Sequence, residues 1–219
     1  MAKHKPQPAD SRGVYAVHTM FRREFDALPA LIRGVSAPDR ARTQIVADHV
    51  ALVVDLVHAH HRSEDHHCWP TLASRGPQDV APVVELMRSR HQTVEAMLRA
   101  TERRIALWRV SGTAEDRDAL ADAIDGVLAP LGRHLDAEEE KILPLIDRYL
   151  TADEWADVAG KGLGNVPRTR IPVLFGMLLQ DASSEHRALF KKAMSTAVFA
   201  VMSRVGPIAL KRYRRKVFA

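Results

Sequence analysis

The spacing of core-like residues over the first 150 positions constrains the fold of this chain most. Apolar residues recur every three or four positions through four segments, near 14–32, 46–64, 80–108 and 120–138. This spacing places side chains on one face of an α-helix. Glycines and prolines separate the segments, and the alternation typical of strands is nowhere sustained. The pattern predicts an all-α fold, an up-down-up-down four-helix bundle.

Polar residues interrupt these apolar faces at positions where a bundle normally has Leu or Val. They are His18, His60, Glu64, His91, His134 and Glu138. A buried carboxylate without a partner costs several kcal/mol, whereas a whole domain is stable by only about 5–15 kcal/mol. Two carboxylates and four imidazoles on such faces therefore predict a compensating ligand. A pair of divalent cations would meet this need.

Two of the polar segments resemble one another and form an internal repeat. HHRSEDHHCWPTL begins at His60 and HLDAEEEKILPLI begins at His134, and in this alignment Glu64 corresponds to Glu138. In each copy the histidine at i and the glutamate at i+4 lie on the same helix face, one turn apart. Such a pair can hold neighbouring metal ions.

A lone histidine precedes each copy by a similar distance, 42 residues for His18 and 43 for His91. Each half of the chain is thus a helical hairpin with one lone histidine and one His-x-x-x-Glu pair. Two such hairpins packed face to face predict a pseudo-symmetric site of four histidines and two glutamates. Nitrogen and oxygen ligands of this kind suit iron best, and manganese or zinc could also bind.

The sequence resembles the hemerythrin-like family, the HHE cation-binding domain. The resemblance covers about residues 12–150 and rests on the two lone histidines, on HHRSED with the following WPTL, and on HLDAEE with the following LPL. It implies a non-haem centre of two iron ions per chain, in which two carboxylates bridge the metals. Carried over to this sequence, the bridges would be Glu64 and Glu138, and the terminal ligands would be His18, His60, His91 and His134.

One departure from the oxygen-carrying members lies on the third helix. Those members use five histidines, two of them close together on that helix, whereas this chain offers only His91, with Met87 one turn before it and Glu95 one turn after. The resemblance therefore favours reactions with H₂O₂ or NO, or the sensing of iron or oxygen, over simple reversible O₂ carriage. Two hypotheses remain open within oxidative or nitrosative stress handling: a catalase-like enzyme, and a sensor or carrier of O₂, H₂O₂ or NO.

Two further residues are candidates for the site. His61 could supply a fifth histidine or a hydrogen bond at the rim of the site. Glu95 could be a metal ligand, a carboxylate that orients the imidazole of His91, or a solvated side chain. Of the other histidines, His49 is expected in the core or partly exposed, and His58 is expected at the surface.

The composition changes after residue 150. The net charge of the chain is +5, yet residues 166–219 alone hold 11 Lys and Arg against 2 Asp and Glu. We expect a short capped helix at 151–155, a linker at 160–172, and helices at 173–179 and 188–202. The sequence thus predicts a bundle domain at 12–150 and a basic helical extension at 151–219. The TADEW motif at 151–155 resembles the extension of actinobacterial family members.

The basic run KRYRRK at 211–216 could attract nucleic acid or anionic lipid. No recognised DNA-binding pattern accompanies it, so nucleic acid is not an expected partner, and a solvated tail is. The alternative function is a metal-stabilised interaction protein whose basic arm binds a partner. The chain has a single cysteine, no apolar signal segment and no run of about 18 apolar residues. It is therefore expected to be cytoplasmic, without a membrane span, and a monomer or dimer.

Overall fold

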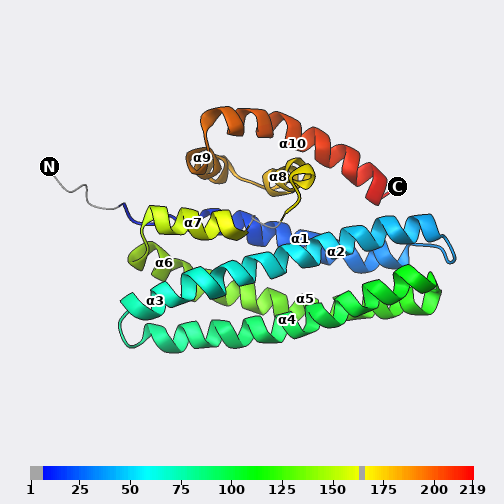
Figure 1. The fold of residues 1–219 in the computed structure, drawn as a ribbon, viewed down its shortest axis with the longest axis horizontal. Coiled ribbons are helices and arrows are strands. Elements are labelled where there is room, and N and C mark those ends of the chain that lie inside the picture. Colours follow the sequence, from blue (N-terminus) through cyan, green and yellow to red (C-terminus); the bar gives the residue numbers. More distant parts are fainter. Residues whose placement is uncertain (1–6, 163–165) are drawn as a thin grey trace.

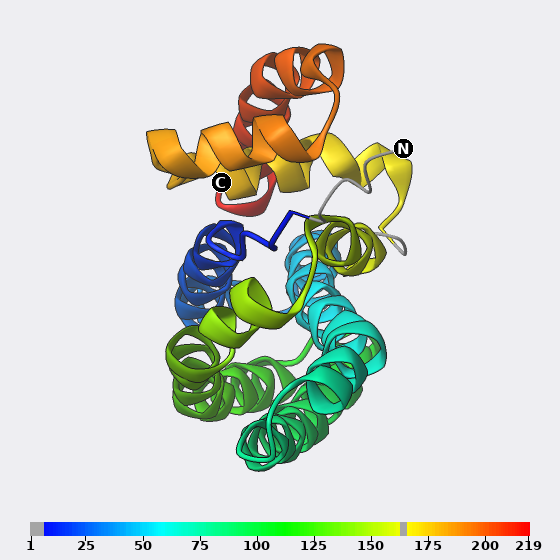
Figure 2. The same cartoon turned by 90° about the vertical axis from the view of Figure 1, so that its left-hand side faces the viewer.

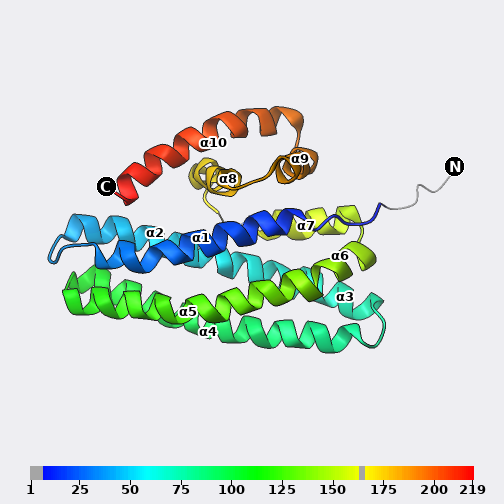
Figure 3. The same cartoon turned by 180° about the vertical axis from the view of Figure 1, so that it is seen from behind.

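Four long helices, packed side by side, form the body of the molecule (Figures 1 and 3). They are α1 (Gly13–Arg33), α2 (Arg40–Ser63), α4 (Val80–Ser111) and α5 (Ala114–Lys141). The computed structural model describes residues 7–162 and 166–219. It confirms the predicted all-α four-helix bundle with further helices at its C-terminal end.

Capping residues set the boundaries of the long helices. The side chain of Asp39 accepts a hydrogen bond from the backbone N–H of Arg42 at the start of α2, and Thr113 accepts one from Asp116 at the start of α5. Gly112 ends α4 with φ of +64°, a left-handed conformation that favours glycine. The short connections that result hold consecutive helices next to one another.

The helix is interrupted near each His-x-x-x-Glu pair of the internal repeat. α2 passes into a π-helical turn, η1 (Glu64–Cys68), and then into α3 (Trp69–Arg75). α5 is followed in the same way by α6 (Leu143–Tyr149). Pro70 and Pro144 lie in the first turns of α3 and α6, where a missing backbone N–H leaves no bond unmade. The helix therefore changes its geometry at Glu64 in the first copy and three residues after Glu138 in the second.

Apolar side chains form two separate clusters along the bundle. One includes Phe25, Ile32, Val53, Leu98, Trp108 and Ile124, and the other includes Val14, Trp69, Leu72, Val84, Met87 and Ile142. On each long helix the predicted site residues fall between members of these two clusters. The polar residues therefore make one layer across a core that is otherwise apolar.

The remaining helices cover the bundle on the side of α1 and α2 (Figure 2). They are α7 (Ala152–Gly162), α8 (Ile171–Gln180), α9 (Ser184–Ala193) and α10 (Thr196–Val217), with a short turn η2 (Arg168–Arg170) before α8. α8 and α10 pack closely at two glycines. A Cβ added at Gly176 would clash with the backbone of Gly206. None of the described helices is long and apolar enough to cross a bilayer.

The expected elements of the extension need two corrections. A single helix at 188–202 is wrong, because α9 ends at Ala193 and the side chain of Ser195 then caps α10 by accepting from the N–H of Val198. The short helix expected at 151–155 continues to Gly162. This shortens the expected linker at 160–172, of which residues 163–165 lie outside the described residues.

Candidate metal centre

The six residues predicted from the repeat lie together in the polar layer of the bundle. α1 contributes His18, α2 and η1 contribute His60 and Glu64, α4 contributes His91, and α5 contributes His134 and Glu138. All except His60 are buried, and the side chain of His60 is 15% exposed. The long helices thus bring groups from four parts of the sequence to one place.

The two glutamates lie between the imidazoles. The two carboxylate oxygens of Glu64 face different histidines: Oε1 lies 3.3 Å from Nε2 of His60, and Oε2 lies 3.6 Å from Nε2 of His91. Oε2 of Glu138 lies 3.6 Å from Nε2 of His18 and 3.5 Å from Nε2 of His134. Each of these separations is longer than a normal N–H···O hydrogen bond. At such distances, a carboxylate oxygen and an imidazole nitrogen can bind the same metal ion.

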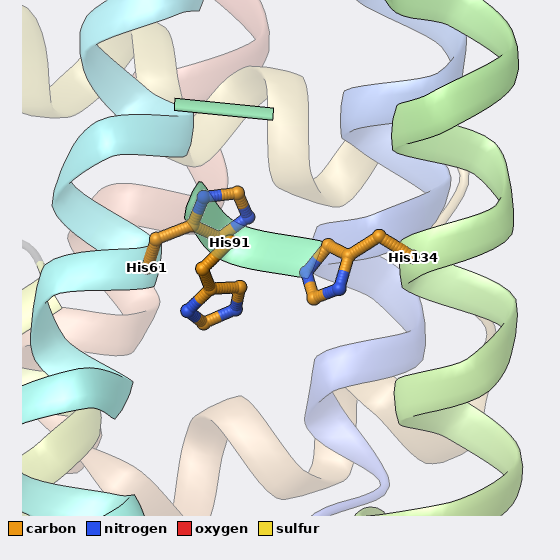
Figure 4. Close-up of side chains that lie close together, drawn as sticks. All are labelled: His61, His91 and His134. Atoms are coloured by element: carbon orange, nitrogen blue, oxygen red, sulfur yellow. The ribbon is translucent and has the colours of Figure 1, made fainter. Parts of the chain in front are cut away.

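His61 joins this cluster from α2. Its ring stacks on that of His91, with centroids 4.1 Å apart, and meets the ring of His134 edge-on at 4.8 Å. Figure 4 shows these three rings converging from three helices. Nitrogen atoms of His61, His91 and His134 come within 4.8 Å of one another, a spacing at which three groups could hold one ion. His18, His60 and Glu138 form a second group of this kind. The cluster therefore holds five imidazoles, and it is less symmetric than the repeat alone indicates.

Two outer carboxylates hold the lone histidines of the repeat. Nδ1 of His91 lies 2.8 Å from Oδ1 of Asp65, and Nδ1 of His18 lies 2.9 Å from Oε1 of Glu139. A carboxylate on Nδ1 fixes the tautomer that leaves Nε2 free to bind a metal. Asp65 and Glu139 occupy equivalent positions in the repeat, each directly after a site glutamate. This alignment is the sequence signal that could have assigned them an orienting role.

Many polar atoms in the centre have no hydrogen-bond partner among the described residues. They include both carboxylate oxygens of Glu64 and Glu138, both ring nitrogens of His61 and His134, and Nε2 of His91. Buried polar groups are almost always hydrogen-bonded or bound to a ligand. The unmatched atoms therefore fit a site built to hold cations.

The electrostatics of the cluster point the same way. Burial raises the pKa of Glu64 well above its usual value, and the nearby Glu138 raises it further. Burial, and then the neighbouring histidines, lowers the pKa of His60 and His61 well below the usual range, and lowers the pKa of His134 to about 2. Neutral imidazoles keep a lone pair for a metal, and a cation would remove the repulsion between the carboxylates.

Glu95 lies outside this cluster. Its Oε2 pairs with Nδ1 of His58 at 2.5 Å, while its Oε1 accepts a hydrogen bond from Arg99. His58 is not a surface residue as expected, because only 4% of it is exposed and its Nε2 lies 3.2 Å from Oε1 of Glu102. The i+4 spacing predicted a role for Glu95 near His91. Glu95 instead connects α4 to His58 of α2.

The comparison with known protein families decides the identity of this bundle. The model of the hemerythrin HHE cation-binding domain matches residues 11–146, which include every residue of the cluster. The chain belongs to the hemerythrin HHE family. No curated protein and no solved structure matches it. Hemerythrin-like domains bind metal ions, and the His and Glu groups described above could hold them.

Proposed function

We propose that this hemerythrin-like chain holds two iron ions in the polar layer and binds or reacts with O₂, H₂O₂ or NO. The proposed ligands are His18, His60, Glu64, His91, His134 and Glu138, with His61 as a seventh. The observation that carries the proposal is the set of buried imidazole and carboxylate atoms without hydrogen-bond partners. Nitrogen and oxygen donors without a thiolate suit iron, and manganese or zinc would fit less specifically.

The positions of the two glutamates support a bridging role. Glu64 turns one oxygen toward His60 and the other toward His91, so one carboxylate spans the two halves of the repeat. Such bridges reduce the net charge of two divalent ions and make their burial tolerable. Bound iron would supply the redox chemistry, while the chain itself positions the ligands and keeps them neutral until a metal arrives.

The surroundings of the layer support a small substrate. The proposed ligands lie between two apolar clusters, and His60, beside Phe21, is the most exposed of them. We infer that O₂, H₂O₂ or NO reaches the centre beside His60. An apolar surrounding also favours small, weakly charged molecules over larger polar substrates.

Metal analysis of the purified protein tests the centre. We expect two metal ions per chain, mostly iron, and consumption of H₂O₂ with release of O₂ if the protein is catalase-like. Two metals with neither binding of nor reaction with O₂, H₂O₂ or NO would indicate a structural metal centre. At most one tightly bound metal in the intact protein would contradict the dinuclear centre.

A pair of histidine variants tests the place of His61. His61→Ala should lower the metal content, because it removes a ring that faces His91 and His134. His58→Ala, three residues earlier on the same helix, removes a buried histidine that pairs with Glu95 and Glu102 outside the cluster. It should leave the metal content unchanged. An equal loss of metal in both variants would show that folding, and not ligation, explains the effect.

A further inference from the structure

The outer face of α10 carries an apolar stripe that no other described element covers. Its members are Val198, Val201, Val205 and Ile208, with exposed fractions of 50%, 57%, 42% and 55%. Their spacings of three and four place them on one helix face. The opposite face of α10 is already used, because Gly206 and Leu210 are buried next to α8. The stripe is therefore a second apolar face on a helix that is already packed.

The stripe lies on the face of α10 opposite to the one that packs on α8. α10 lies at the outer edge, separated from the bundle along much of its length by α8 and α9, and far from α4 and α5 (Figures 1 and 2). A flat partner could therefore approach α10 without meeting the bundle.

Positive charge continues the stripe toward the end of α10. Arg212 and Arg215 follow Ile208 at spacings of four and three, so they extend the same face, and both are exposed. Arg204 lies beside the stripe. α10 contains no Asp or Glu, and residues 166–219 carry a net charge of +9. Any partner of this face must therefore combine an apolar layer with negative charge.

A groove adjoins the basic end of the stripe. It has a volume of about 920 Å³, and apolar residues that include Leu179, Leu210 and Phe218 line it together with Lys211 and Arg215. Arg215 thus belongs both to the face of the stripe and to the wall of the groove. The groove, like the stripe, therefore combines cationic side chains with an apolar surface.

We propose that α10 docks the protein on the surface of a membrane rich in anionic phospholipid. The four apolar side chains would enter the boundary between headgroups and acyl chains, and the arginines would lie near the phosphates. A second copy of the chain is a poorer occupant, because pairing the stripes would bring two strongly positive segments together. Nucleic acid would pair with the arginines but would leave the apolar stripe exposed to water.

Vesicle co-sedimentation of the full-length, metal-loaded protein tests this proposal. We expect binding to vesicles that contain phosphatidylglycerol, weak binding to pure phosphatidylcholine, and a steep loss of binding with added salt. The double variant Val201→Gln with Val205→Gln should bind roughly 10-fold more weakly, and so should Arg212→Gln with Arg215→Gln.

A matched control separates the stripe from exposed apolar residues in general. Leu107 and Val110 on α4 are 51% and 76% exposed, and their replacement by Gln should leave vesicle binding unchanged. All variants should keep the metal content of the wild type, so the outcome is independent of the proposed metal centre.

Three results would overturn the proposal. The first is no binding to either vesicle, or equal binding to both. The second is a dimer in solution that the valine substitutions abolish. The third is tighter binding to a generic DNA duplex that depends on the arginines and not on the valines.

Discussion

Asp65 and Glu139 show how one residue after each site glutamate serves the opposite half of the repeat. Asp65 follows Glu64 and contacts His91, whereas Glu139 follows Glu138 and contacts His18. The two contacts differ in their surroundings. Glu139 also accepts a hydrogen bond from Arg22, and the side chain of Asp65 is the more exposed of the two carboxylates. The carboxylate that orients His18 therefore has an additional partner and is less exposed than the carboxylate that orients His91.

We predict that Asp65→Asn and Glu139→Gln each weaken metal binding by about 10-fold or more. The amide keeps the size of the side chain but removes the charge that orients the imidazole and supports its basicity. Chelator competition on the folded protein measures the change. Glu140→Gln is the control, because Glu140 is exposed and pairs only with Lys141. Wild-type affinity in both test variants would show that the outer carboxylates have no such role.

At the scale of elements, α10 is fastened to the bundle by a buried carboxylate. Glu24 on α1 is 1% exposed, and its Oε1 accepts hydrogen bonds from Arg23 and from Arg214 of α10. Nδ1 of His49 on α2 lies 3.0 Å from the hydroxyl of Tyr213 on α10. The basic C-terminal run is therefore not simply a solvated tail, because two of its members pair with buried groups of the bundle.

We predict that Arg214→Met lowers the free energy of unfolding by about 1–3 kcal/mol, because Glu24 then keeps only one of its two cations. Arg215→Met is the matched control, since Arg215 is exposed and has no ion pair in the described structure. Urea unfolding gives the global effect, and hydrogen exchange in α10 gives the local one. If both variants unfold alike, the contact with Glu24 does not stabilise the docked helix.

His49 adds a pH dependence to the same contact. Burial, with the charges of Arg214 and Arg170, lowers its pKa from 6.5 to about 4. Oε2 of Glu24 lies 3.7 Å from Nε2 of His49. The negative charge of Glu24, however, is already balanced by ion pairs with Arg23 and Arg214. The unfolded chain therefore takes up a proton near pH 6.5, which the folded chain accepts only near pH 4.

The free energy of unfolding should consequently fall as the pH drops from 6.5 toward 4. At about 1.4 kcal/mol per pKa unit, the loss through His49 approaches about 3 kcal/mol. Denaturant unfolding of metal-loaded wild type and His49→Gln between about pH 7 and pH 4.5 measures it. The variant should show a shallower decline, and parallel curves would assign the pH dependence to other groups.

The proposed boundary between a bundle at 12–150 and an extension at 151–219 remains a prediction. Val173, Leu174 and Met177 of α8 belong to the same apolar cluster as the bundle residues. The two units therefore share buried surface, although the cluster of proposed ligands ends at Glu138. A fragment of residues 12–150 that folds and retains metal would support the boundary.

For the whole molecule, the free energy of metal binding should become free energy of folding. A ligand present at about 100 times its dissociation constant stabilises the folded state by about 2.7 kcal/mol. Since about 1 kcal/mol shifts the melting temperature of a chain of this size by roughly 2–4 °C, chelation should lower it by roughly 5–10 °C. Differential scanning calorimetry with and without chelator measures the shift.

Variants of the glutamates complete that experiment. Glu64→Ala and Glu138→Ala should lose most of the metal, and chelator should then change their melting temperatures little. A wild-type melting temperature that does not respond to chelator would show that the metal centre does not support the fold.

The sequence by itself determined the four long helices, the bundle and six members of the polar layer. Local signals are sufficient for these, because helical spacing assigns residues to a face and the repeat aligns His60 with His134 and Glu64 with Glu138. Only the tertiary structure decided which neighbours each side chain meets. The ring of His61 turns into the layer, whereas the carboxylate of Glu95 turns away from the layer and pairs with His58. The reason is physical: sequence spacing specifies a direction around one helix axis, whereas a contact depends on how the neighbouring helices pack.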